Sequence, residues 1–167
     1  MNILKLLMIM LLLTLSMNYS AWAKPSIAVL DFELKDVTLL PNNADTIART
    51  AALQESLSKE LRYAGFTIVP INANNQQIAN AGEGYLFDHA DSSAELGKQV
   101  AADYVLVGRL HKPSFLFIYL MAHLVEVNTG RLVDSYSIES KGGDKKLIGK
   151  AVETLAEKIS QRLSHAP

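Results

Sequence analysis

The segment Ser114–Val127 constrains the fold of this chain more than any other part of its sequence. Its odd-numbered side chains from Phe115 to Met121 are aromatic or apolar, and so are the even-numbered ones from Leu116 to Ala122. Successive side chains of a strand point to opposite faces of a sheet, so a strand with one wet face alternates apolar and polar residues. The first half of this strand is therefore expected to be covered on both faces, by helices or by a second subunit.

The patterns on either side of this strand predict the rest of the sheet and its helices. Short apolar runs indicate buried strands, and apolar residues every three or four positions indicate helices. We expect strands at 27–33, 66–71, 104–110, 114–127 and 131–140, and helices at 44–64, 75–81, 92–101 and from 145 onward. The order β-α-β-(α)-α-β-β-β-α predicts an α/β (α+β) fold with a single mixed five-stranded sheet and helices on its faces. The first and last helices are expected to take opposite faces.

The first residues of the chain have the pattern of a secretory signal. A lysine precedes an apolar run that ends at Met17, and Ala21 and Ala23 have the spacing of a cleavage site. We expect residues 1–23 to be a signal peptide and residues 24–167 to be a single domain, exported to the periplasm as a soluble protein. The alternative is an uncleaved membrane anchor, but the apolar run is shorter than the about 20 residues that span a bilayer.

Cysteine and charge content narrow the classes of function. The chain has no cysteine, so we expect neither disulfides nor a cysteine-linked lipid anchor, and a hydrophobic core must stabilise the fold. Its 16 basic and 17 acidic side chains give a net charge of −1, with no dense basic run. Binding to nucleic acid is therefore not expected.

Four phrases of the sequence together resemble a known group of proteins. They are Ile27–Phe32, Leu61–Phe66, Ala101–Gly108 and Val125–Val133. In this order they resemble a family of small secreted proteobacterial proteins known as a domain of unknown function (DUF). More distantly, they are similar to the amino-terminal domain of TolB and to the periplasmic domain of CsgG. The resemblance implies a non-enzymatic periplasmic adaptor or accessory domain.

Charged residues at strand ends form a first candidate site. Asp31 and Glu33 end the first expected strand, and Arg109, His111 and Lys112 end the third. If these strands are parallel, the five side chains converge at one rim, where open α/β sheets bind ligands. The alternative is that the strands end in water, where charged side chains belong.

The segment Tyr85-Leu86-Phe87 is a second candidate, as a partner-binding site. It lies between Gly84 and Asp88, and it either folds back onto the core or forms an exposed anchor for a partner. The four histidines do not have metal-ligand spacing, and the sequence has no phosphate loop or dinucleotide fingerprint. We therefore expect no catalytic residues, no metal and no cofactor.

These patterns favour an exported, non-enzymatic binding or accessory module that acts through contacts with another periplasmic or envelope protein, with an oligomer possible. Two alternatives remain open. One is a hydrolase-like enzyme at the strand-end rim, which an Asp31–His111 pair in a deep pocket would favour. The other is a carrier of a small apolar ligand, which a closed cavity beside the long strand would favour.

Overall fold

The computed structural model describes residues 24–39, 41, 43–141 and 145–165. The signal peptide expected at 1–23 lies outside this range. The strands are β1 (Ser26–Val29), β2 (Glu33–Asp36), β3 (Thr67–Val69), β4 (Tyr104–Lys112), β5 (Phe117–Glu126) and β6 (Leu132–Lys141). The helices are α2 (Ala44–Ala51), α3 (Leu53–Tyr63), α4 (Ala73–Ala79), α5 (Tyr85–Asp88), α6 (Ala90–Gln99) and α7 (Lys145–Ser164). Within the described residues, no helix is both long and apolar enough to cross a bilayer.

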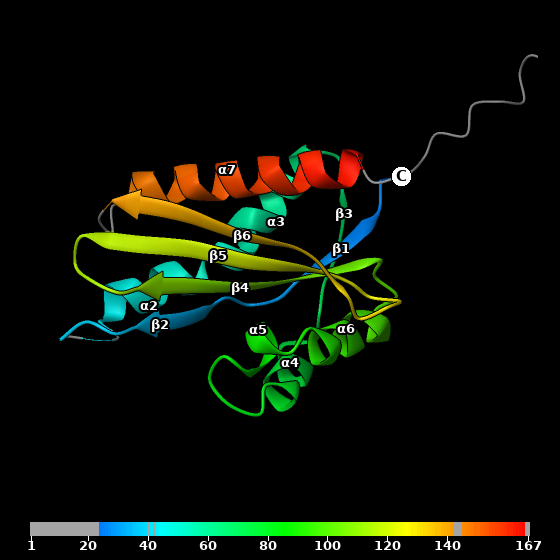
Figure 1. The fold of residues 1–167 in the computed structure, drawn as a ribbon, viewed down its shortest axis with the longest axis horizontal. Helices are drawn as coiled ribbons and strands as arrows, with labels where there is room; N and C mark the ends of the chain where they lie inside the picture. Colours follow the sequence, from blue (N-terminus) through cyan, green and yellow to red (C-terminus); the bar gives the residue numbers. More distant parts are fainter. Residues whose placement is uncertain (1–23, 40, 42, 142–144, 166–167) are drawn as a thin grey trace, which may run out of the picture.

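The predicted mixed, open sheet with helices packed on it is confirmed (Figure 1). Its order is β3-β1-β4-β5-β6, and β2 also pairs with β4. Strands β1, β2 and β3 run parallel to their neighbours, whereas the β4–β5 and β5–β6 pairs are antiparallel. The sheet therefore combines βαβ connections with a carboxyl-terminal meander, as the element order predicts.

The sheet has six strands rather than five, because the run expected as one strand at 27–33 is interrupted. Ile27 pairs with Tyr104, but Glu33 pairs with Arg109, so the β1–β2 segment contains one more residue than β4 over the same span. An extra residue of this kind bends a strand as a bulge does. The ring of Phe32 fills the break, because it lies where a Cβ on Gly108 would be, with ring atoms only 2.2 Å away.

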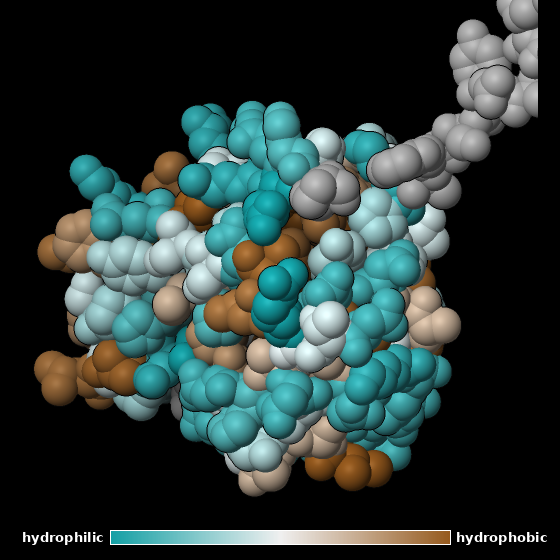
Figure 2. Space-filling view, turned by 45° about the vertical axis from the view of Figure 1, so that its right-hand side comes forward, coloured by the Kyte–Doolittle hydropathy of each residue, from teal (hydrophilic) through white to brown (hydrophobic). Residues whose placement is uncertain are grey.

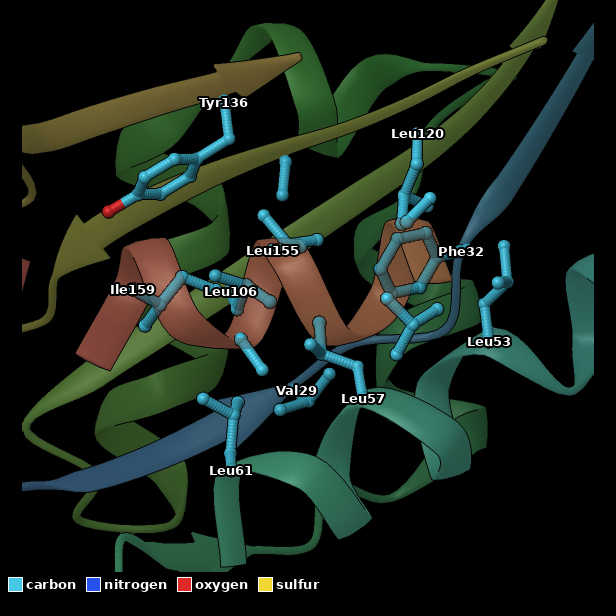
Figure 3. Close-up of a cluster of buried hydrophobic side chains, with 14 of the residues drawn as sticks. Val29, Phe32, Leu53, Leu57, Leu61, Leu106, Leu120, Tyr136, Leu155 and Ile159 are labelled. Carbon is cyan, nitrogen blue, oxygen red and sulfur yellow. The ribbon is translucent and has the colours of Figure 1, made fainter. Parts of the chain in front are cut away.

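One face of the sheet is covered by α3 and α7 along its whole length. Figure 3 shows leucines of α3 and α7 meeting side chains of β1, β4 and β5 in one cluster. Leu57, Leu155 and Ile159 have no exposed surface in this cluster. The expectation that the first and last helices take opposite faces is wrong, since α3 and α7 pack against each other on the same face.

The other face is covered by α4, α5 and α6 over only part of its length. Their apolar residues pack on Val105, Val107 and Val125. In Figure 1 these helices lie below the right-hand half of the sheet, and the left-hand parts of β4, β5 and β6 extend beyond them. The second face therefore has a covered half and an uncovered half.

Within this chain the first half of β5 is covered on one face only, so the expected cover by helices on both faces is wrong, whereas cover by a second subunit stays a prediction. Ile118 and Leu120 are buried under α7 and α3. On the opposite face Tyr119 and Met121 are half-buried, and Phe117 is 36% exposed. The reason is the shortness of α4 to α6, which end before they reach this part of the sheet.

The helix expected at 44–64 is divided into α2 and α3 at Ala52. Asn43 caps α2, because its side-chain oxygen accepts a hydrogen bond from the backbone N–H of Thr46 at 2.8 Å. Gly65, with φ of +89°, ends α3 in the left-handed conformation that glycine readily adopts.

Candidate functional site

Glu33 and Arg109 are partners across the parallel β2–β4 pair, as the rim hypothesis requires. Their side chains form an ion pair, and the Arg109 guanidinium also lies 3.5 Å from a carboxylate oxygen of Asp88. Gly84 approaches so closely that a Cβ there would lie 2.6 Å from the guanidinium, so a larger residue at this position would displace Arg109. Arg109 is buried and is engaged by acidic groups of the chain itself.

Lys112 lies on the opposite face of the sheet from Arg109, since the two are three residues apart in one strand. Its ammonium nitrogen lies 2.9 Å from Asp36, and the Thr38 hydroxyl donates to the same carboxylate at 2.7 Å. Burial alone would raise the pKa of Asp36, but the hydrogen bonds from Thr38 and Lys112 outweigh it and hold this pKa below its usual value. Lys112 therefore contributes to a buried ion pair under the sheet.

Asp31 and His111 do not form the pair that would favour an enzyme. Asp31 lies in the break between β1 and β2, where its backbone exchanges two hydrogen bonds with the side chain of Gln76. His111 lies further along β4, opposite Lys35 and Tyr119. The five predicted rim residues thus occupy four separate places, and a role for them in ligand binding stays a prediction.

The segment Tyr85-Leu86-Phe87 forms the short helix α5, which packs across the sheet. Leu86 and Phe87 are buried, as in the alternative in which this segment folds back onto the core. Tyr85 is half-buried and stacks on His89. A partner-binding role for these three residues stays a prediction, with Tyr85 as the most accessible of them.

Two side chains of the sheet face that α4, α5 and α6 cover hold Phe87 in place. Its ring stacks on His123 with centroids 3.9 Å apart, and the Arg109 guanidinium lies 4.1 Å from its centre. The backbone oxygen of Phe87 is 2.9 Å from Nδ1 of His123. Burial lowers the pKa of His123, and the Arg109 charge adds to this, although the hydrogen bond to Phe87 opposes it. His123 is therefore poised as the neutral imidazole beneath α5.

The uncovered half of the second face, which we call the open face, consists of side chains from β2, β4, β5 and β6. They are Lys35, His111, Phe117, Tyr119, Met121, Ser135, Ser137 and Glu139. The Tyr119 hydroxyl donates to Glu139 at 3.3 Å. Beside this face, β6 is the last strand of the sheet, and its outer edge pairs with no other strand of the described residues. The open face and this edge form one continuous surface of aromatic, hydroxyl and unpaired backbone groups.

A groove on the other side of the molecule does not match the cavity that a ligand carrier requires. It lies between α3 and α7, has a volume of about 270 Å³, and is lined by Ser56, Lys59, Glu60, Gly149 and Glu153 among others. It is open to solvent and is separated from β5 by the helices themselves.

Comparisons with known proteins give a family and a fold. Residues 25–159 match the family DUF3280, described as "Protein of unknown function (DUF2380)". No curated protein matches the sequence.

Three solved structures illustrate the fold. Lipoprotein GNA1162 from Neisseria meningitidis is 20% identical, with a TM-score of 0.54 over 81% of this chain and 96% of that one. The PelC dodecamer from Paraburkholderia phytofirmans is 15% identical, with a TM-score of 0.54 over 87% of this chain and 91% of that one. TolB from Acinetobacter baumannii is 15% identical, with a TM-score of 0.52 over 86% of this chain but only 29% of that one. The likeness to TolB in fold is confirmed, whereas the likeness to CsgG stays a prediction.

Proposed function

This chain belongs to the DUF3280 family, and from that premise we propose that it is a non-enzymatic module of the bacterial cell envelope that works by contacting another protein. The observation that carries the proposal is the open face beside the free edge of β6. A strand edge presents a row of backbone donors and acceptors that a partner strand can pair with. Aromatic side chains next to such an edge supply contact area and specificity.

The charged side chains support a binding role rather than catalysis. Arg109 is engaged by Glu33 and Asp88, and Lys112 by Asp36, so these groups stabilise the fold. None of the three solved structures named above is described as an enzyme.

Export to the periplasm is part of the proposal. It rests on the signal-like pattern of residues 1–23, and it predicts that the mature protein begins at Lys24. Intact-mass measurement of the protein from fractionated cells tests this directly, and a retained Met1 in the membrane fraction would contradict it. GNA1162 is described as a lipoprotein, so the absence of a lipid anchor here also stays a prediction, which the same mass measurement tests.

The partner is either another envelope protein or a further copy of this chain. PelC is described as a dodecamer, which shows that a protein of this fold can associate with itself. The free edge of β6 is accessible to either kind of partner.

Site-specific photocrosslinking in living cells tests the proposal. A photoreactive phenylalanine analogue at Ser137 on the open face should give one discrete adduct, whereas the same analogue at exposed Lys158 on α7 should not. Adding Tyr119→Ser should remove the Ser137 adduct with little change in the melting temperature, because Tyr119 is only half-buried and serine places no second carboxylate opposite Glu139. Mass spectrometry of the adduct identifies the partner, including a second copy. Equal crosslinking from both positions, or none from Ser137 in a folded protein, would overturn the proposal.

A further inference from the structure

Exposed apolar side chains gather at one end of the molecule, in two loops that lie side by side. Val37 and Leu39, which follow β2, are 58% and 92% exposed. Phe115 and Leu116, in the loop between β4 and β5, are 57% and 71% exposed. The backbone N–H of Val37 donates to the carbonyl of Lys112 at 3.1 Å, which joins the two loops. We call these four residues the apolar tip.

The tip projects from the molecule. Figure 2 shows hydrophobic side chains standing out at the left margin, on the side where β2 and the β4–β5 hairpin end in Figure 1. Exposed apolar patches mark membrane or protein contacts, and a projecting one can enter the boundary between the headgroups and acyl chains of a bilayer.

Hydrogen bonds within the loops hold the apolar side chains outward. The Ser114 hydroxyl oxygen accepts from the backbone N–H groups of Leu116 and Phe117, both at 3.2 Å. The Asp36 carboxylate accepts from the backbone N–H and the hydroxyl of Thr38. These hydrogen bonds fix the conformation of both loops, so the tip should lose little conformational entropy when it binds.

The surroundings of the tip are basic, although the chain as a whole is not. Segments 35–39, 112–117, 139–141 and 146–150 together hold five lysines and two acidic residues, in a chain whose net charge is −1. Lys141 is exposed and pairs in register with Phe117, and Lys35 is exposed two residues before Val37. Helix α7 begins at this same end of the molecule (Figure 1).

We propose that the apolar tip inserts into the surface of a membrane that contains anionic phospholipid. Phe115, Leu116, Val37 and Leu39 enter the boundary between headgroups and acyl chains. Lys35 and Lys141 lie beside phosphate groups at the level of the headgroups. Insertion of apolar side chains and attraction of lysines to anionic lipid together give reversible surface binding. The four apolar residues of this contact lie outside the open face, whereas Lys35 borders both surfaces.

Vesicle flotation with the purified protein tests the proposal. The protein should float with phosphatidylcholine vesicles that contain phosphatidylglycerol, and less with phosphatidylcholine alone or at high salt. Phe115→Ser with Leu116→Ser should reduce the partition coefficient roughly tenfold or more, because two large apolar groups no longer leave water. The matched control is Tyr63→Ser with Ile78→Ser, which removes two apolar side chains of similar exposure far from the tip and should float like wild type. Lys35→Gln and Lys141→Gln should each weaken binding about fivefold.

A fluorescent variant keeps the test independent of folding defects. Tryptophan at Leu116 should shift its emission to the blue when phosphatidylglycerol vesicles are added, and tryptophan at Tyr63 should not. Equal flotation of the tip and control variants would overturn the proposal. A folded wild-type protein that does not bind these vesicles would also overturn it. If, in addition, a tip variant loses a protein crosslink, the tip would be assigned to a protein partner instead.

Discussion

The two faces of the sheet differ although β5 contributes equally apolar residues to both. On the face under α3 and α7, Leu120 is 1% exposed and Ala122 has no exposed surface. On the other face, Tyr119 and Met121 are only half-buried. The apolar content of a single strand therefore does not determine whether its faces are covered. Cover depends on where the helices lie.

The neighbouring strand β6 indicates which face is wet. Tyr136 and Ile138 point to the covered face, and Ser135, Ser137 and Glu139 point to the open one. Cross-strand neighbours share one environment, so the alternation of polar and apolar residues in β6 indicates which face of β5 is exposed to solvent. The sequence of β5 alone does not show this. Four predictions test and refine this contrast between the faces.

The largest effect is expected from truncating adjacent residues of β5 that face opposite ways. Leu120→Ala should reduce the free energy of unfolding by about 2–5 kcal/mol, because it leaves a cavity in a packed core. Met121→Ala on the open face should cost less than about 1 kcal/mol. Urea denaturation measures both. Similar losses at the two positions would mean that the open face is covered in solution.

Gly108→Ala tests how tightly the covered face is packed. The new methyl group would meet the Phe32 ring, and overpacking of this kind costs about 1–3 kcal/mol. Replacing Phe32 with Ala first should remove most of that additional cost, and a double-mutant cycle in urea measures the coupling. Independent, additive losses would show that the ring does not fill the break between β1 and β2.

Gly149→Ala probes the outer surface of α7, above the same face. Apart from the two chain neighbours and the backbone of the helix itself, no heavy atom lies within 4 Å of a Cβ at this position, which is inside a helix. Since alanine is the better helix former, the substitution should raise the free energy of unfolding by up to about 1 kcal/mol. Thermal denaturation measures the gain, and a lower melting temperature would indicate that the groove between α3 and α7 closes over this position.

His123 marks the boundary of the open face, and its effect should appear as a pH dependence. Because burial lowers its pKa in the folded state, the unfolded chain binds the proton more readily. Its contribution to stability should be complete above the unfolded value of about 6.5, and should be lost as pH falls from there through the lower folded pKa. Melting temperatures of wild type and His123→Gln across this window measure it, and parallel curves for the two proteins would exclude His123 as the cause.

The order and pairing of the main strands follow from local patterns in the sequence. These patterns are the alternation of apolar and polar residues in strands, the apolar stripes of helices, and the glycine at position 65. Each of them depends only on residues close together in the sequence. The break between β1 and β2 depends on contact between Phe32 and Gly108, which are far apart in the chain. The side of the sheet on which α7 packs also depends on tertiary contacts, so neither feature could be predicted locally.

The candidate sites were predictable to a smaller extent. Glu33 and Arg109 were expected at one rim and do meet, because parallel pairing carries that information. Lys112 and His111 lie on opposite faces of the sheet because successive side chains of a strand alternate, and the rim hypothesis did not take this alternation into account. The apolar tip has a signal in the sequence, since Phe115 and Leu116 follow a proline that ends β4, but only the structure places Val37 beside them.

Both ends of the described chain leave the domain at the end opposite the apolar tip (Figure 1). Lys24 donates a hydrogen bond to the carbonyl of Ala64, and Ala64 lines a shallow groove together with His165. A domain with neighbouring ends can be joined to other domains, or inserted into a host protein, without disturbing the remainder of its surface. The likeness to TolB, which covers only 29% of that chain, shows the same architecture as one part of a larger protein. A fluorescent or affinity tag at either end of this domain should therefore leave both proposed contact surfaces free.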